Sequence, residues 1–353
     1  MSKMHKNKSF HIGGVTISPG QCASVDFEIA KLYTHSPLSV IAEVIHGKKP
    51  GPVLMINAAI HGDELNGVEV VRQILGRINP ITLIGTIIAI PVVNVFGFIH
   101  KSRYLPDRRD LNRCFPGSER GSIAGRMAYQ ISEQIVRRCT HIIDLHTAAI
   151  YRANLPQIRA NLSNAETNEM AIAFGTPVVI DAALREGSLR SEAESIGIPV
   201  ITYEAGEALR FEPYAITAGV KGVKRVMRHL GMIRQSKRRS TVEPVIARAT
   251  RWVRAETDGI LRSHVSLGQR VSKGQVLASI SNPSGSEEIQ TYAPQGGIII
   301  GQQTLPLVNE GDAIFHIAYF EEPDNLVERL VENYLDEVVD DEGNEIRFGI
   351  GTI

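Results

Sequence analysis

Three largely hydrophobic runs lie in the first half of the chain, and polar residues end or follow each of them. The runs are PVLMINAAI (52–60), TIIAIPVV (86–93) and HIIDLH (141–146). Continuous rather than alternating apolar residues are typical of strands buried on both faces of a parallel or mixed sheet. Between the runs, apolar residues recur at helical spacing over 66–76 and 122–138. Strands that alternate with helices predict an α/β domain with helices on both sheet faces.

The rest of the first 230 residues continues this alternation. Short β runs precede residue 50 (VTISPG, SVDFEIAKL and LSVIAEVIHG), and the glycines and prolines at 47–52 predict a turn. A long polar loop is expected at 94–120. After HIIDLH, the sequence predicts a VVID run (178–181), a helix near 188–196, a fourth central strand in PVITYEAGE (199–207) and a last helix over 214–230.

The pattern changes after Gly231. A basic connector (235–240) leads into short β runs separated by glycines, and the stretches around 258–271 and 295–312 look like two related halves. Such a repeat predicts a small all-β, barrel-sandwich-like domain over 241–320. It resembles the biotinyl/lipoyl-carrier fold, but the hairpin between the halves (282–287) has no lysine to carry a cofactor. We therefore expect a structural, lid or oligomerisation role.

The last segment, 321–353, is acidic. It fits a solvated tail and a strap over a neighbouring surface equally well.

Composition narrows the range of partners. The 353 residues include 38 basic and 38 acidic ones, so the formal net charge is zero. This balance gives no support to a basic surface that would bind nucleic acid or an anionic membrane. No stretch is apolar enough for a membrane helix, and the basic start lacks the apolar region of a secretory signal. Three cysteines without paired spacing fit a reducing compartment. We expect a cytoplasmic protein with a small-molecule partner, and a homo-oligomer is left open.

Metal ligands are predicted where two of the buried runs end. His61 and Glu64 follow the first run, and His146 closes HIIDLH. Two imidazoles and one carboxylate are the protein ligands of catalytic zinc sites that keep a fourth position for water. A turn histidine and a helix-start carboxylate would explain the first pair alone, but not its combination with His146. Asp144 is a candidate to accept the other N–H of the His146 ring.

Two further groups lie at predicted sheet edges. Glu204 follows PVITY, where it can act as a general base toward water and later protonate a leaving amine. An exposed strand-end glutamate is the alternative. The polar loop carries Arg103 and a cluster that ends in Asn112 and Arg113. Arginine forks bind carboxylates and stabilise oxyanions, although such a cluster on its own would fit a solvated basic loop.

In this order, the motifs HGDELNG (61–67), DLNR (110–113), DLHTA (144–148) and YEAGE (203–207) resemble the succinylglutamate desuccinylase/aspartoacylase family of zinc carboxypeptidase-like hydrolases. The resemblance covers roughly residues 50–230, and the β-rich part looks like the family's C-terminal domain. It implies a mixed-sheet catalytic domain over 1–240 that holds one zinc ion on His61, Glu64 and His146. It also implies that Glu204 is the general base.

The resemblance assigns roles in the polar loop as well. Asn112 and Arg113 correspond to the clamp for a substrate carboxylate, and Arg103 to the arginine that polarises the scissile carbonyl. This stretch is longer than in the named enzymes, so Arg108 and Arg109 are alternatives to Arg103.

One arginine that aspartoacylases place shortly before the catalytic strand has no clear match here. Arg190 is the nearest substitute, with Arg185 behind it. We therefore expect a zinc-dependent hydrolase that removes the acyl group from an N-acyl amino acid or related small amide, without assuming aspartate or succinylglutamate. A zinc carboxypeptidase for short peptides and a non-catalytic metal-binding relative are the alternatives. Glu204 counts against the last, because a binding protein needs no base.

Overall fold

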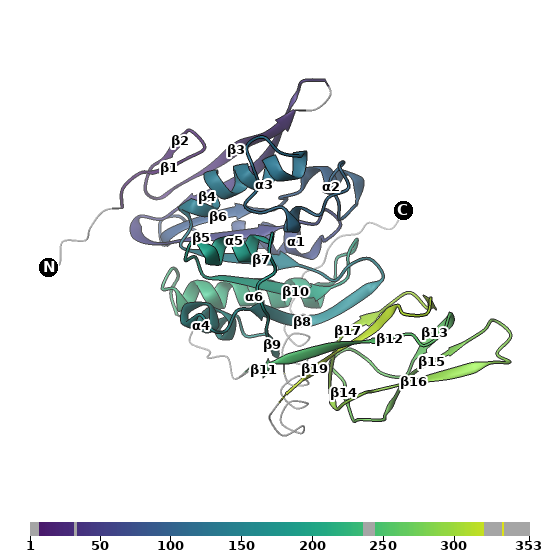
Figure 1. The fold of residues 1–353 in the computed structure, drawn as a ribbon. Coiled ribbons are helices and arrows are strands. Elements are labelled where there is room, and N and C mark those ends of the chain that lie inside the picture. Colours follow the sequence, from purple (N-terminus) through teal and green to yellow (C-terminus); the bar gives the residue numbers. More distant parts are fainter. Residues whose placement is uncertain (1–6, 32–33, 236–243, 321–333, 335–353) are drawn as a thin grey trace, which may run out of the picture.

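A computed structural model describes residues 7–31, 34–235, 244–320 and Tyr334. Within these residues, thirteen strands form one mixed sheet (Figure 1). Its main path runs in the order β12 (Ala249–Arg254), β19 (Ala313–Tyr319), β17 (Gly297–Gln303), β8 (Arg152–Ala160), β10 (Val200–Gly206), β7 (His141–His146), β5 (Lys49–Ala58), β6 (Ile84–Ile90), β4 (Pro37–His46) and β3 (Gln21–Lys31). Off this path lie β9 (Val178–Asp181), β11 (Val245–Ala247) and β14 (Arg270–Val271).

The hydrophobic runs form the middle of this sheet. Strands β5, β6, β7 and β10 contain the four predicted central strands, and the pairs β5–β6, β5–β7 and β7–β10 are parallel. Every residue of β7 is buried, as a continuous apolar run predicts. The strands at both ends of the path pair antiparallel. The predicted α/β class with a mixed sheet is confirmed.

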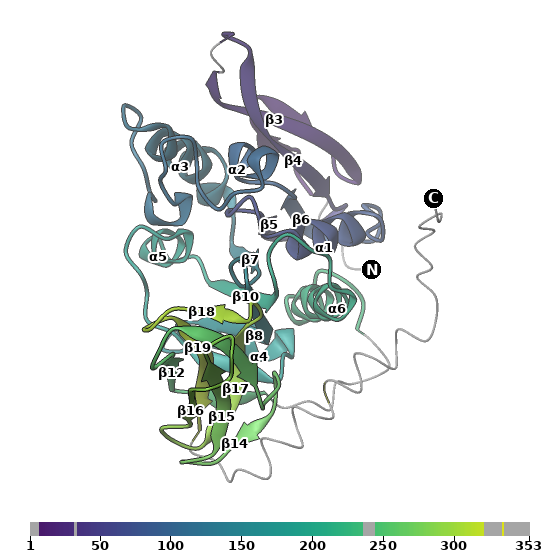
Figure 2. The same ribbon diagram turned by 90° about the vertical axis from the view of Figure 1, so that its right-hand side faces the viewer.

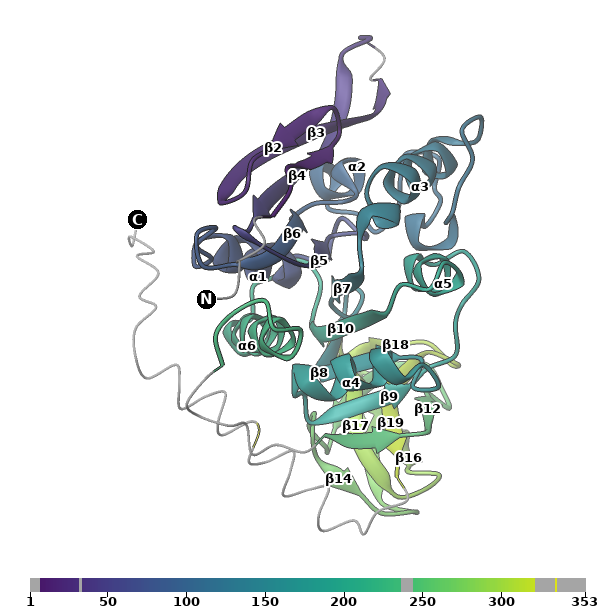
Figure 3. The ribbon, with the colours of Figure 1, turned by 90° about the vertical axis from the view of Figure 1, so that its left-hand side faces the viewer.

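Helices cover both faces of the sheet (Figures 2 and 3). On one face, α1 (Asn66–Leu75), α4 (Ala165–Phe174) and α6 (Pro213–His229) pack against a core that includes Ile143 of β7. On the other face, α3 (Ile123–Gln134) and α5 (Leu189–Ser195) pack against a core that includes Ile142. Adjacent residues of a strand point to opposite faces, so one run of apolar residues supplies both cores.

The predicted helices within the described residues are present, with one change at an end and two additions, α2 and α4. The helix predicted to reach residue 138 stops as α3 at Gln134, and a 3₁₀ turn (Val136–Arg138) follows. The predicted polar loop begins with a short helix, α2 (Val95–His100), because the Asn94 side chain caps it by accepting a hydrogen bond from the Gly97 N–H at 2.8 Å. A second 3₁₀ turn spans Leu111–Arg113. Within the described residues, no helix is both long and apolar enough to cross a membrane.

Strand β8 has no counterpart in the sequence predictions. Its sequence, RANLPQIRA, mixes polar and apolar residues and contains a proline, so no apolar period identifies it. In the fold, β8 pairs with β10 on one side and with β17 on the other. The strand therefore connects the first 230 residues with the C-terminal strands in one continuous sheet.

The β runs predicted after residue 244 are present as strands. Besides β12, β17 and β19, a separate four-stranded sheet contains β16 (Glu288–Tyr292), β15 (Val276–Ser281), β13 (Gly259–Ser263) and β18 (Leu307–Val308). Near the start of the chain, β1 (Phe10–Ile12) and β2 (Val15–Ile17) form a hairpin. The proposed boundary at 240 and, apart from Tyr334, the acidic segment 321–353 lie outside the described residues. The division into three domains stays a prediction.

Candidate active site

Parallel pairing of the central strands brings the predicted site residues to one edge of the sheet. His146 is the last residue of β7, and Glu204 lies beside it on β10. His61 and Glu64 lie in the turn between β5 and α1. The carboxyl ends of β5, β7 and β10 point the same way, which is where ligands bind in open α/β sheets.

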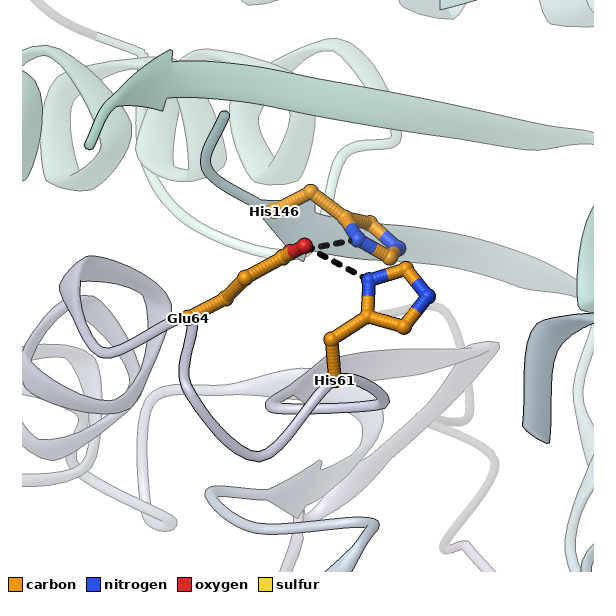
Figure 4. Close-up of side chains that lie close together, drawn as sticks. All are labelled: His61, Glu64 and His146. Carbon is orange, nitrogen blue, oxygen red and sulfur yellow. Dashed lines mark hydrogen bonds and ion pairs between the residues drawn. The ribbon is translucent and has the colours of Figure 1, made fainter. Parts of the chain in front are cut away.

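The two histidines converge on one carboxylate (Figure 4). The Nδ1 atom of His61 lies 2.6 Å from Glu64 Oε1, and the Nδ1 atom of His146 lies 2.7 Å from Glu64 Oε2. One ligand atom from each residue lies within 4.8 Å of the other two, and all three residues are buried. These three residues, the His61–Glu64–His146 cluster, could hold a metal ion.

Aspartates hold the outer nitrogens of both rings. Asp144 Oδ2 lies 2.8 Å from His146 Nε2, and Asp110 Oδ1 lies 3.1 Å from His61 Nε2. Asn57 fixes Asp144 in turn by donating to its Oδ1 at 2.6 Å. A carboxylate that accepts the far N–H of a ligating histidine fixes the ring and its tautomer. Both histidines therefore present Nδ1 to the same point.

Opposite charges dominate the electrostatics of the cluster. Burial acts to raise the pKa of Glu64, but His61 and His146 outweigh it and hold that pKa well below its usual value. Burial acts to lower the pKa of His146, yet Asp144 and Glu64 raise it well above its usual value. Metal binding here would release protons from the imidazoles, because ligating histidines must be neutral.

Gly62, in the turn between these ligands, must be glycine for a steric reason. Its φ is not positive, so the backbone conformation alone does not demand glycine. A Cβ at this position would lie 1.9 Å from the carbonyl carbon of Gly97. Glycine is required because the backbone of α2 approaches closely.

Of the three candidate arginines in the polar loop, Arg103 lines the cavity at the cluster. It donates to Asp110 Oδ2 through Nη2 at 2.8 Å and through Nε at 3.2 Å, and its Nη1 lies 3.4 Å from Glu64 Oε1. Arg108 and Arg109 are exposed and do not line the cavity. Of the three, Arg103 is therefore the one that lies at the cavity, and its role stays a prediction.

A cavity of about 320 Å³ opens at the cluster and contains the other predicted residues. Asn112 and Arg113 line it, and the Oδ1 of Asn112 accepts the Leu189 N–H at 2.9 Å. Arg190 also lines it, but Nη1 and Nη2 donate to the carbonyls of Ala182 and Ala183 at 3.0 and 2.9 Å. Arg190 therefore holds the loop at 182–183, and Arg185, which also lines the cavity, is exposed.

Glu204 lines the same cavity and is held from the neighbouring strand. Asn154 donates to its Oε2 at 3.1 Å, and Arg159 Nε lies 3.7 Å from its Oε1. Burial raises the pKa of Glu204, while Arg159 and His146 oppose this rise. The site thus contains a carboxylate in a fixed orientation beside the cluster.

Sequence reasoning missed part of the cavity wall. Arg152, Asn154 and Arg159 lie on the unpredicted strand β8, and Trp252 comes from β12 of the C-terminal strands. Asp110 lies within the DLNR motif but received no role, although it contacts both His61 and Arg103. The polar residues that interrupt β8 were the available signal, since side chains that break a strand pattern often serve a site.

Comparisons with known proteins identify a family and similar proteins. A sequence model of the succinylglutamate desuccinylase/aspartoacylase catalytic domain matches residues 50–230. The N-alpha-acetyl-L-2,4-diaminobutyric acid deacetylase of Halomonas elongata is 27% identical over 285 residues, which cover 76% of this chain and 82% of that protein.

Solved structures share the fold. The product-bound ectoine utilization protein EutE (DoeB) of Ruegeria pomeroyi superposes with a TM-score of 0.77 at 21% identity, over 84% of this chain and 95% of the other. A succinylglutamate desuccinylase/aspartoacylase of Rhodobacter sphaeroides gives a TM-score of 0.75 at 22% identity, over 86% and 96%.

Proposed function

The chain belongs to the succinylglutamate desuccinylase/aspartoacylase family, and from this premise we propose that it is a zinc-dependent deacylase of N-acyl amino acids. The observation that carries the proposal is the convergence of Glu204, Arg103 and the His61–Glu64–His146 cluster on one cavity. The relative from Halomonas elongata, named as a deacetylase of an N-acetylated amino acid, supports the reaction class.

The donor set of the cluster fits zinc. Two imidazole nitrogens and one carboxylate oxygen face each other, and aspartates already occupy the outer nitrogens. His61, Glu64 and His146 would hold the ion, which is the ligand set of many catalytic zinc sites. When bound, zinc supplies Lewis-acid chemistry that lowers the pKa of water and polarises a carbonyl group.

Glu204 and Arg103 supply the remaining chemistry at the scissile amide. Glu204, oriented by Asn154 at 3.1 Å, takes a proton from the attacking water and returns it to the departing amine nitrogen. Arg103 is fixed through Nε and Nη2 by Asp110, so its charge is held beside the cluster. A preorganised cation at this place stabilises the oxyanion that develops on the carbonyl oxygen.

Residues of the polar loop orient the substrate. Asn112 and Arg113 lie together at the cavity, where they can bind the carboxylate of the amino acid and align the amide with Glu204. Arg190 is assigned to positioning, because its guanidinium holds the loop at 182–183. For the strands after residue 244 we propose a small all-β domain that completes the cavity wall with Trp252.

Amine release from a substrate panel tests this function. Zinc-loaded protein is incubated with N-acetyl, N-formyl and N-succinyl amino acids, including Nα-acetyl-L-2,4-diaminobutyrate, and with a dipeptide. We expect release from at least one N-acyl amino acid, and a loss of about 10²–10⁴-fold in kcat for Glu204→Gln at unchanged zinc content. Glu186→Gln, which alters an exposed glutamate that does not line the cavity, is the matched control. Cleavage of the dipeptide alone would establish a peptidase instead, and no turnover on any compound would refute catalysis.

A further inference from the structure

The cavity carries more positive charge than the proposed reaction uses. The carboxylates that line it are Glu64, Asp144 and Glu204. Six arginines line it as well, namely Arg103, Arg113, Arg152, Arg159, Arg185 and Arg190. With the histidines counted as neutral, the lining side chains have three positive charges in excess, and two remain when Asp110, which pairs with Arg103, is included. A substrate with a single carboxylate would balance only part of this charge.

Arg152 is held differently from the other arginines. Its guanidinium carbon lies 5.3 Å from the centroid of the Trp252 ring. Trp252 stacks on His316, with ring centroids 4.5 Å apart and planes inclined by 4°. Arg152 thus lies over Trp252, which stacks on His316, and we call these three residues, of which Arg152 and Trp252 line the cavity, the stacked column. Within the described part of the chain, no ion pair joins Arg152 to a carboxylate, whereas Arg103 and Arg159 each approach one.

Strand pairing fixes this column. Trp252 and His316 are direct partners in the β12–β19 ladder, and β17 joins these strands to the β8 strand that carries Arg152. Gly301 of β17 permits the close packing, since a Cβ there would lie 3.1 Å from the Cβ of His316 and 3.0 Å from Asn154 Oδ1. Strand pairing therefore fixes the positions of Trp252 and His316 relative to the strand that carries Arg152.

His316 contributes no charge of its own. It is only 2% exposed, and burial, aided by the nearby Arg159, lowers its pKa to about 3. The ring is neutral near pH 7, so it supports Trp252 without repelling Arg152.

A cation–π contact of this kind does not use up the guanidinium N–H groups, so they stay available to bind an anion. We propose that the stacked column forms a second anion subsite of the cavity, in which Arg152 binds a second carboxylate of the substrate. The subsite selects N-acyl amino acids that carry this carboxylate on the amino-acid side chain or on the acyl chain. The identity of the substrate rests on the proposed function, whereas the subsite itself can be tested by binding alone.

Binding to zinc-loaded Glu204→Gln protein, in which turnover is expected to be about 10²–10⁴-fold slower, provides the test. Isothermal titration calorimetry compares N-acetyl-L-glutamate with N-acetyl-L-glutamine for the side-chain carboxylate. It also compares N-succinyl-L-alanine with N-butyryl-L-alanine for the acyl carboxylate. We expect one charged compound to bind at least about tenfold more tightly than its neutral counterpart, the scale of one hydrogen-bonded charge pair.

Arg152→Gln in the same background should abolish this preference and leave the affinity for the neutral compound unchanged. A merely structural change would weaken both compounds. Arg251→Gln is the matched control, because Arg251 is exposed on the same strand as Trp252 and does not line the cavity. Trp252 is the single tryptophan of the chain, so the charged compound should also change the intrinsic emission, and Arg152→Gln should remove that change.

The outcomes separate the two proposals. An Arg152-dependent preference without amine release by the wild type would keep the subsite and refute the deacylase. Amine release with a preference that survives Arg152→Gln would keep the deacylase and overturn the subsite. No binding of any of the four compounds, or equal binding within each pair, would overturn the subsite as well.

Discussion

Replacing Asp110 with asparagine should weaken metal binding, although Asp110 is not a proposed ligand. Its Oδ1 accepts from the Asn112 N–H at 2.8 Å and lies 3.1 Å from His61 Nε2, while its Oδ2 accepts from Arg103 Nη2 at 2.8 Å. If Nδ1 of His61 faces the metal, Nε2 carries the proton, and all the partners of Asp110 are donors. An asparagine has one acceptor oxygen, so in either orientation its amide NH₂ group faces donors.

The size of the effect follows from the lost support behind His61. Removing a carboxylate that orients a ligating histidine lowers metal affinity by about 10–100-fold, which corresponds to about 1.4–2.8 kcal/mol. Arg103 loses its ion pair in the same variant, so kcat/KM should fall further than the metal affinity alone explains.

Competition with a chromophoric chelator measures the zinc Kd of each variant. Asp107→Asn is the matched control, because Asp107 lies in the same loop and its side chain accepts from the N–H groups of Arg109 and Ala124 without contact to the cluster. We expect the Kd of the control to stay within about twofold of the wild type. A wild-type Kd for Asp110→Asn would refute the assigned role of Asp110 in orienting His61.

Three further variants test the metal site, the stacked column and the core. His146→Ala should lose most bound zinc and all turnover, so a full zinc-to-protein ratio by elemental analysis would contradict the ligand assignment. His316 has a folded-state pKa of about 3, below its usual 6.5. The unfolded chain therefore takes up the proton first, and stability is lost as pH falls below about 6.5. Urea unfolding should show that the wild type loses about 1.4 kcal/mol more than His316→Phe between pH 7.5 and 5.5, and equal losses would show that His316 titrates normally. Phe174 is fully buried and stacks on Tyr203 at 4.9 Å. Phe174→Ala should lower the free energy of unfolding, measured in urea, by about 3–5 kcal/mol. Phe211→Ala, at an exposed position, should lower it by less than about 0.5 kcal/mol. A similarly small loss in both variants would be inconsistent with this core.

The central strands could be predicted because each is decided locally. A continuous apolar run such as HIIDLH fits a strand buried on both faces, and the helical spacing over 66–76 appears as α1. The polar residues that close these runs then pointed to one sheet edge. The placement of His61, Glu64 and His146 within 4.8 Å of one another agrees with that expectation.

Strand β8 shows where local pattern failed. Arg152, Asn154 and Arg159 interrupt its apolar residues because they line the cavity. These side chains reach the cavity because β8 pairs with β10 and with β17 of the C-terminal strands, which lie far away in sequence. A window of neighbouring residues contains no information on such contacts.

The sequence by itself determined the alternation of the central strands β5, β6, β7 and β10 with helices and the residue types at the ends of these strands, but not β8. Hydrophobic periodicity is a property of neighbouring residues, so it can be read without the fold. Only the tertiary structure decided that Arg103, and not Arg108 or Arg109, lines the cavity, and that Asp110 joins it to His61. It also decided that Trp252 completes a wall begun by β8. These contacts depend on strand pairing between distant segments, and that pairing is fixed only when the whole sheet forms.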